Sequence, residues 1–206
     1  GARRDLTIAP VKSGVLALSY CFSTFISTLL ICLTATAICL LYLGKVGWYL
    51  TVGDVGLLLL DVVLLTLFGT AFSSLVNFPL STNGQGSAVG TIISTGYGFI
   101  CGAYMPISQF SKGLQRVISF LPGTYGTSLL RNHTLRGVFA EMSSKGFPDE
   151  VVEAIRDSVD CNLYFFGEKV NISAMYSVLI AAILVLIGLY VFINVLTVKI
   201  KKRRVK

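Results

Sequence analysis

Four long stretches with almost no charge limit the fold of this chain more than any other feature. Residues 14–43 hold no charged side chain, and the stretches 55–76, 87–104 and 174–198 contain a single acid, Asp61. A helix needs about 20 apolar residues to cross the ~30 Å hydrocarbon core of a bilayer. Isolated strands would leave backbone groups unpaired in lipid, so each stretch is predicted to be helical. We therefore expect an all-α integral membrane protein with four transmembrane helices.

The overall composition agrees with a membrane protein and excludes a soluble catalytic domain. Hydrophobic residues make up 54% of the chain and charged residues 13%, whereas soluble domains carry roughly 25% charged residues. The remaining charges gather at the two ends and between residues 112 and 169. The net charge of +7 is typical of basic cytoplasmic flanks that orient a membrane chain. No nucleic-acid partner is expected.

The basic flanks predict the orientation of the chain. Arg3, Arg4 and Lys12 precede the first span, and the basic tail 199–206 follows the last. Both ends should therefore be cytoplasmic, which requires an even number of spans. We expect a multi-pass protein of the plasma (cytoplasmic) membrane, in a bacterial host.

This orientation divides the chain into five parts. They are a cytoplasmic loop (1–13), three transmembrane helices with short loops (14–104), an extracellular segment (105–173), the last transmembrane helix (174–198) and a basic cytoplasmic tail (199–206).

The extracellular segment is predicted to contain two short helices. Between residues 106 and 122, apolar residues recur at helical spacing opposite Lys112, Gln115 and Arg116. A segment that is too short to span and charged on one side should lie at the interface or dip into it and return. A second amphipathic helix is expected at 148–159, against which Phe147 and residues 163–166 would pack; its role is left open.

No catalytic motif accompanies these elements. The chain lacks a glycine-rich phosphate loop that ends in Gly-Lys-Ser/Thr, so it should not hydrolyse nucleotides and is not predicted to be an enzyme. The single histidine, His133, has no cysteine or carboxylate at ligand spacing, so we expect it to be solvated and no metal to be bound. Cys161 is the one cysteine in a polar stretch, so an internal disulfide framework is not predicted, while a bridge between chains stays open.

Asp61 stands out within its span. It lies roughly 12 Å deep at 1.5 Å per residue, where an acid costs up to about 3 kcal/mol on insertion scales. Two interpretations are open. Asp61 belongs either to a polar transport path or to a structural pair with a basic or hydroxyl group on another helix.

The third span carries a ridge of small residues, each four positions after the last. Such a ridge forms one helix face and lets another backbone approach closely. It indicates either tight helix packing or a moving, subunit-facing surface. We call it the small-residue ridge: Gly86, Gly90, Ser94, Gly98 and Gly102.

The clearest motif follows this ridge. Residues 102–125 read GAYMPISQFSKGLQRVISFLPGTY, and Leu129-Leu130-Arg131 follow. This pattern resembles the signature of type-2 permeases of ATP-binding-cassette (ABC) exporters. In that family a glycine closes the penultimate span, and a Met/Phe-Pro-Ile turn, an amphipathic re-entrant segment, a Leu-Pro-x-x-Tyr end and an arginine come next. The resemblance implies a re-entrant motif formed by Pro106, Gln115, Pro122, Tyr125 and Arg131.

The start of the chain carries a second, weaker resemblance. It is similar to the cytoplasmic loop that precedes the third span in these permeases and holds the coupling helix. The resemblance implies that this loop touches a separate ABC ATPase subunit through Arg3, Arg4, Asp5, Pro10 and Lys12.

Together these features imply the membrane-spanning permease subunit of an ABC exporter. By the same resemblance it would form a homodimer or heterodimer in the lipid bilayer. The partner ATPase subunits would supply ATP and Mg²⁺ chemistry, and the chain itself would hold no cofactor. The family pattern has six spans and this chain has four, so we expect the C-terminal four-span portion. Two other functions stay open: a membrane interaction protein with an external partner-binding domain, and an ion-coupled carrier that uses Asp61.

Overall fold

The computed structural model describes residues 13–80 and 82–204. The predicted coupling residues lie outside the described residues: Arg3, Arg4, Asp5, Pro10 and Lys12.

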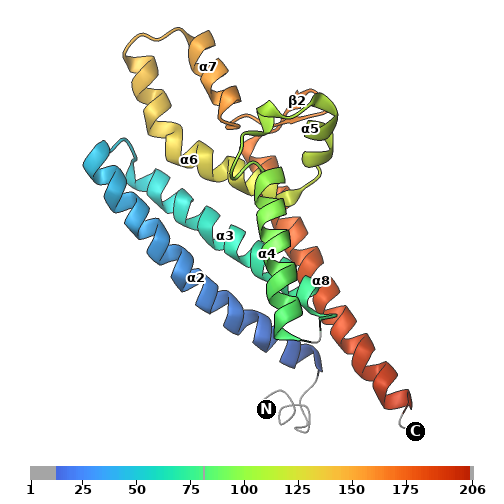
Figure 1. The fold of residues 1–206 in the computed structure, drawn as a ribbon. Coiled ribbons are helices and arrows are strands. Elements are labelled where there is room, and N and C mark those ends of the chain that lie inside the picture. The colour runs from blue at the N-terminus through green and yellow to red at the C-terminus, as the bar shows by residue number, and fades with distance from the viewer. Residues whose placement is uncertain (1–12, 81, 205–206) are drawn as a thin grey trace.

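Three long helices form the body of the structure (Figure 1). They are α2 (Ser13–Val46), α3 (Val52–Asn77) and α8 (Ile172–Arg204), and each packs against the other two. Their stretches Gly14–Val46, Val52–Asn77 and Ile172–Thr197 are long and apolar enough to cross a membrane. Within the described residues there are therefore three candidate spans of this kind, whereas the sequence predicted four.

The helix at the predicted third span has a different character. It is α4 (Asn83–Ile100), with 18 residues, and it touches α3 less than α2, α6 or α8 does. Its first turn, Asn83-Gly-Gln-Gly, is polar and rich in glycine, so α4 is less apolar than the candidate spans in α2, α3 and α8. The predicted end at residue 104 is also wrong, because the helix ends at Ile100.

A glycine explains that early end. Gly102 has φ of 82°, a left-handed conformation that closes many helices. Ala103 N donates to Gly98 O at 2.9 Å, and Gly102 N donates to Phe99 O at 3.2 Å. These two bonds form a Schellman motif, so the chain leaves the helix axis before Tyr104.

Four helical elements and a hairpin follow between α4 and α8, at the end of the structure away from the termini (Figure 1). The amphipathic helices expected at 106–122 and 148–159 are present, although the first is interrupted and shorter than predicted. The elements are η1 (Ile107–Gln109), α5 (Lys112–Ile118), α6 (Pro122–Ser144), α7 (Asp149–Ser158), β1 (Tyr164–Phe165) and β2 (Glu168–Lys169), the last two paired antiparallel.

Helix α6 is the element that the sequence did not predict. No helix was predicted there, because the polar run 131–134 interrupts its apolar positions. Its buried face mixes the apolar residues Tyr125, Leu129 and Phe139 with the polar residues Thr124, Ser128, Asn132 and His133. The helix is held by contacts with α3 and α8, which an amphipathicity argument does not detect.

The main core lies where α3, α5, α6 and α8 meet. Ile118, Leu129 and Leu179 are completely buried there. A smaller cluster joins α6 to α7 through Phe139, Val152 and Cys161. Phe147, which was expected to pack on the second amphipathic helix, is instead 47% exposed.

Helix α6 also makes a backbone contact with the turn between α2 and α3. A Cβ atom added to Gly137 would overlap the carbonyl group of Tyr49. Two residues later the turn enters α3 through a capping box between Thr51 and Asp54, and Arg136 Nη1 lies 3.3 Å from Asp54 Oδ1. This contact fixes the end of the α2–α3 pair against α6.

Candidate functional site

Asp61 is completely buried between three helices. Tyr176 Oη on α8 donates to Asp61 Oδ1 at 2.6 Å, and His133 Nδ1 on α6 lies 2.5 Å from Asp61 Oδ2. The His133 and Tyr176 rings are stacked, with centroids 6.2 Å apart. Both carboxylate oxygens thus have partners, which is the arrangement expected for a structural pair with a basic and a hydroxyl group. Burial of a carboxylate is tolerated when it is paired in this way.

The prediction that His133 is solvated is wrong. The residue is only 4% exposed, because it lies on the inward face of α6 and not in a loop. Its partner Asp61 is 72 residues away in sequence. No local spacing rule detects such a pair, and the polarity of the surrounding segment concealed it.

A second polar centre is built around Asp160, at the end of α7. Cys161 N donates to Arg156 O at 2.9 Å and Asp160 N donates to Asp157 O at 3.2 Å, so α7 closes with a Schellman motif. Its left-handed position is Asp160, with φ of 55°. Glycine usually occupies that position, and at the end of α6 it is Gly146, with φ of 81°. The local conformation alone does not explain an aspartate here.

The side chain of Asp160 supplies the explanation. Its carboxylate accepts hydrogen bonds from Ile107 N at 2.6 Å and Ser108 N at 3.1 Å. These are the first amides of η1, which have no partner within that helix. Arg131 Nη1 donates to the same carboxylate at 2.8 Å, and Arg131 Nη2 donates to Gly102 O. We call this set of contacts the Asp160 clamp.

The Asp160 clamp joins four segments, and three of them, the turn after α4, helix α6 and the end of α7, are distant from one another in sequence. It holds the turn after α4 through Gly102, the start of η1 through Ile107 and Ser108, helix α6 through Arg131, and the end of α7. Asp160 is 3% exposed, so its charge is stabilised by these donors and hardly by water. Arg131 was predicted from the motif, whereas Asp160 was not.

The other predicted motif residues satisfy the irregular backbone between α4 and α6. Gln115 Nε2 donates to Phe110 O at 2.8 Å, and Tyr125 Oη donates to Ser119 O at 2.5 Å. Pro122 occupies the first turn of α6, where a missing amide proton costs nothing. Pro106 precedes η1. Non-helical backbone can lie at membrane depth only when its polar groups are hydrogen-bonded to protein or water. In this turn, the side chains of Gln115 and Tyr125 supply such bonds to backbone carbonyl groups.

Cys161 lies next to the clamp and is buried. It is 2% exposed, and burial raises the pKa of its thiol to about 11. Neither property favours the bridge between chains that the sequence left open, because disulfide exchange needs an accessible thiolate.

A cavity of about 320 Å³ lies between α3 and α4. Its wall is mostly apolar and includes the rings of Phe68, Phe72 and Tyr97, of which Phe72 and Tyr97 are 5.5 Å apart between centroids. Asp61 is not part of its lining. The cavity therefore suits an apolar group better than an ion.

Three members of the small-residue ridge line this cavity, namely Gly90, Ser94 and Gly98. A Cβ on Gly90 would meet nothing within 4 Å, whereas one on Gly98 would lie 2.5 Å from the Tyr104 ring. Gly86 faces Asn77, and Gly102 lies beyond the end of α4. The ridge thus faces open space and one folded-back ring, without a neighbouring helix backbone against Gly90.

Comparison with known families decides how these features are to be understood. Residues 11–190 match the ABC-2 family transporter protein, a range that covers the first two candidate spans, most of the third, the predicted re-entrant motif and the Asp160 clamp. The chain belongs to the ABC-2 transporter family. No curated protein and no solved structure matches it.

Membership in the ABC-2 family confirms the resemblance derived from residues 102–131. The chain is a multi-pass membrane permease domain of an ABC transporter and is not itself catalytic. ABC-2 permeases in general work with an ATPase partner. Signals for Asp61 and Arg131 were present in the sequence; for His133, Tyr176 and Asp160 they were absent, because each acts through a partner on a distant segment.

Proposed function

We propose that this ABC-2 permease domain is part of an exporter and forms the substrate path between paired permease subunits. The observation that carries the proposal is the turn between α4 and α6. Its motif residues satisfy its own backbone, and the Asp160 clamp holds it at one end of the helices. A turn whose own side chains bond its backbone polar groups is suited to enter the membrane. At this position it would close the substrate path from outside.

The proposal includes a fourth crossing by α4. At 1.5 Å per residue, its 18 residues give a length of about 27 Å, close to the ~30 Å of a hydrocarbon core. Figure 1 shows α4 beginning near the end of the structure where both termini lie and finishing near α5 and α6. With α2, α3 and α8 this gives an even number of crossings. The basic flanks then place both termini in the cytoplasm and residues 105–173 outside.

We propose that this chain contributes the cavity between α3 and α4 to the substrate path. The apolar wall of the cavity and its small lining residues Gly90, Ser94 and Gly98 support the proposal that a second permease subunit or an apolar substrate approaches α4 at this surface. Asp61 supports the helix bundle from within, since it is fully buried and both its oxygens are paired. The ion-coupled carrier is therefore less well supported than the exporter.

The driving force would come from a partner ATPase that binds ATP and Mg²⁺. We propose that the loop before α2 contacts this subunit through Arg3, Arg4 and Asp5, with Pro10 and Lys12 in the connection to the helix. Helix α2 is 34 residues long and continuous from Ser13 to Val46, so a push at its start would reach the far end of the bundle.

This coupling can be tested in membranes that contain the chain and its ATPase. The double change Arg4→Ala and Asp5→Ala should lower substrate-stimulated ATP hydrolysis, because it removes charged contacts with the ATPase. The amount of protein in the membrane should not change. Lys206→Ala, in the other basic flank, serves as the matched control. Coupling that survives the double change would place the contact elsewhere, for instance in the loop 77–86.

A further inference from the structure

An exposed aromatic cluster lies where α5 meets the β1–β2 hairpin. The ring of Phe120 packs edge-on against Phe165 and Phe166, with centroids 5.3 and 6.0 Å apart, and Phe165 and Phe166 are 4.9 Å apart. Phe120 and Phe166 are each 62% exposed. Leu114 and Val117 on α5 are exposed as well. We call these five residues the aromatic patch.

The tip of the hairpin holds a bulky residue in a backbone conformation that disfavours it. Phe166 and Gly167 are the two turn residues, with φ of 50° and 95°. A two-residue turn with both φ values positive favours Asn-Gly or Asp-Gly, and a bulky residue in the first position is strained. A phenylalanine that is strained and also exposed indicates a role for its ring outside the folded chain.

The position of the hairpin indicates what meets that ring. Strand β2 ends at Lys169, and the candidate span of α8 begins at Ile172, so only two residues separate the hairpin from a membrane-crossing helix. Figure 1 shows α5 and the hairpin beside the start of α8. Phenylalanine and leucine side chains on one exposed face are typical of segments that lie at this depth, at the boundary between headgroups and acyl chains.

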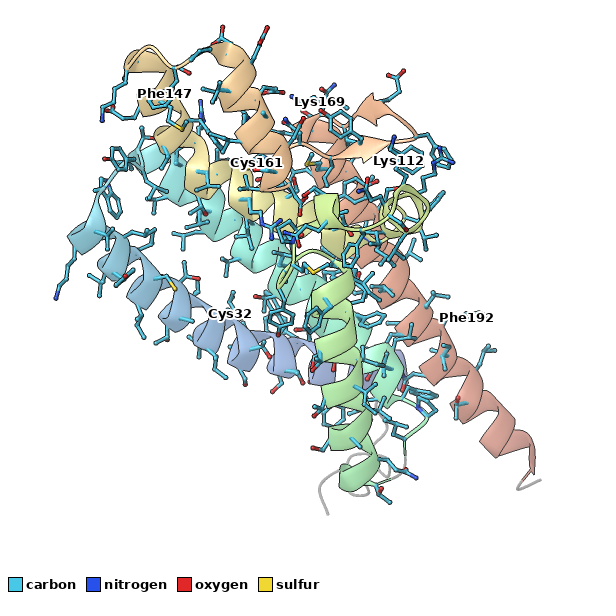
Figure 2. The ribbon with its side chains drawn as sticks, turned by 45° about the horizontal axis from the view of Figure 1, so that its top comes forward. Cys32, Lys112, Phe147, Cys161, Lys169 and Phe192 are labelled. Carbon is cyan, nitrogen blue, oxygen red and sulfur yellow. The ribbon has the colours of Figure 1, made fainter. Side chains whose placement is uncertain are left out.

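The charges around the aromatic patch match a phospholipid surface. Lys112 and Arg116 are exposed on α5, and neither forms an ion pair within the part of the chain that the structure describes. Figure 2 shows Lys112 near the hairpin and Phe147 on the opposite side of the same end. Lys169 is already paired with Glu153, and Glu168 is the one acid in the hairpin itself. A short helix with exposed apolar residues and free cations is typical of interfacial binding.

We propose that the aromatic patch is seated in the bilayer interface beside the start of α8, with Lys112 and Arg116 on lipid phosphates. The occupant of this surface is lipid, not a second protein. The Asp160 clamp connects the end of α7, just before the hairpin, to η1. Binding of the aromatic patch to lipid would therefore also fix the depth of the turn after α4 in the membrane. The proposal depends on α8 crossing the membrane and not on exporter activity.

Tryptophan fluorescence in reconstituted protein tests the proposal. Trp48 is the single native tryptophan, so the background is the full chain with Trp48→Phe, in phosphatidylcholine vesicles with and without brominated acyl chains. One reporter is Phe166→Trp and a second is Phe165→Trp, in case the first disturbs the turn. The matched control is Phe147→Trp, at an exposed aromatic outside the patch. Aqueous acrylamide is the opposing quencher.

We expect both patch reporters to emit at shorter wavelength than the Phe147→Trp control and to be quenched by brominated lipid. The control should be quenched by acrylamide instead. Patch reporters that acrylamide quenches as strongly as the control would overturn the proposal, since the patch would then face water. Reporters that neither quencher reaches would overturn it too, because protein would then cover the patch.

Discussion

Gly137→Ala should prevent this chain from reaching its folded state in the membrane. The added methyl group would overlap the carbonyl of Tyr49, and a backbone group in a helix-to-helix turn cannot rotate away as a side chain can. Overpacking usually costs about 1–3 kcal/mol, and a collision with backbone should lie at or above the top of that range. Thermal unfolding of purified protein in detergent, followed by size-exclusion chromatography, measures the effect.

Two glycines serve as controls for Gly137. Gly126 lies on the same helix, but its added Cβ would meet the flexible end of Leu65, so alanine there should cost less. Gly188 on α8 has nothing within 4 Å, and alanine there should be neutral or slightly stabilising, since alanine is favoured over glycine in helices by about 1 kcal/mol. If Gly137→Ala matched Gly188→Ala, the contact between α6 and Tyr49 would be absent.

Asp160→Gly should destabilise the segment between α4 and α8, although glycine is the better residue for the local conformation. The change relieves a left-handed φ of 55°, worth about 1–2 kcal/mol for a residue with a Cβ. It also removes three hydrogen bonds to a buried carboxylate, and a bond to a charged group contributes roughly 1.5–3 kcal/mol. The second effect is larger, so we expect a net loss of a few kcal/mol and faster proteolysis between residues 144 and 171.

Asp160→Asn separates the two contributions. Asparagine also tolerates the left-handed region, and it keeps one acceptor oxygen for the amides of η1 while losing the charge that holds Arg131. Its stability should fall between those of the parent and Asp160→Gly. A protein with Asp160→Gly that is more stable than the parent would show that the Asp160 clamp does not hold the turn.

The sequence predicted those parts of the fold that depend on local patterns. The long uncharged runs indicated α2, α3 and α8, because length and apolarity alone decide a crossing helix. The motif from Gly102 to Arg131 indicated the turn and the family. Helix α6 was missed for a physical reason: polar residues that include Ser128, Asn132 and His133 interrupt the apolar residues of its buried face. Their hydrogen-bond partners lie on other segments of the chain.

The polar centres were predicted only in part. Asp61 was conspicuous because a carboxylate within an apolar run is costly, but its partners His133 and Tyr176 are 72 and 115 residues away. Asp160 looked like an ordinary loop residue. Its left-handed φ, in a position usually taken by glycine, and the hydrogen bonds of its carboxylate together show that the side chain is retained for contacts elsewhere.

The arrangement proposed for this ABC-2 permease is tested most directly by its topology. Single cysteines at Lys45, Asp149 and Lys202 are compared with the parent chain on sealed cells treated with a membrane-impermeant maleimide. We expect Lys45→Cys and Asp149→Cys to be labelled on sealed cells and Lys202→Cys to be labelled only after the cells are permeabilised. Labelling of Lys202→Cys on sealed cells, or protection of Asp149→Cys, would contradict this arrangement.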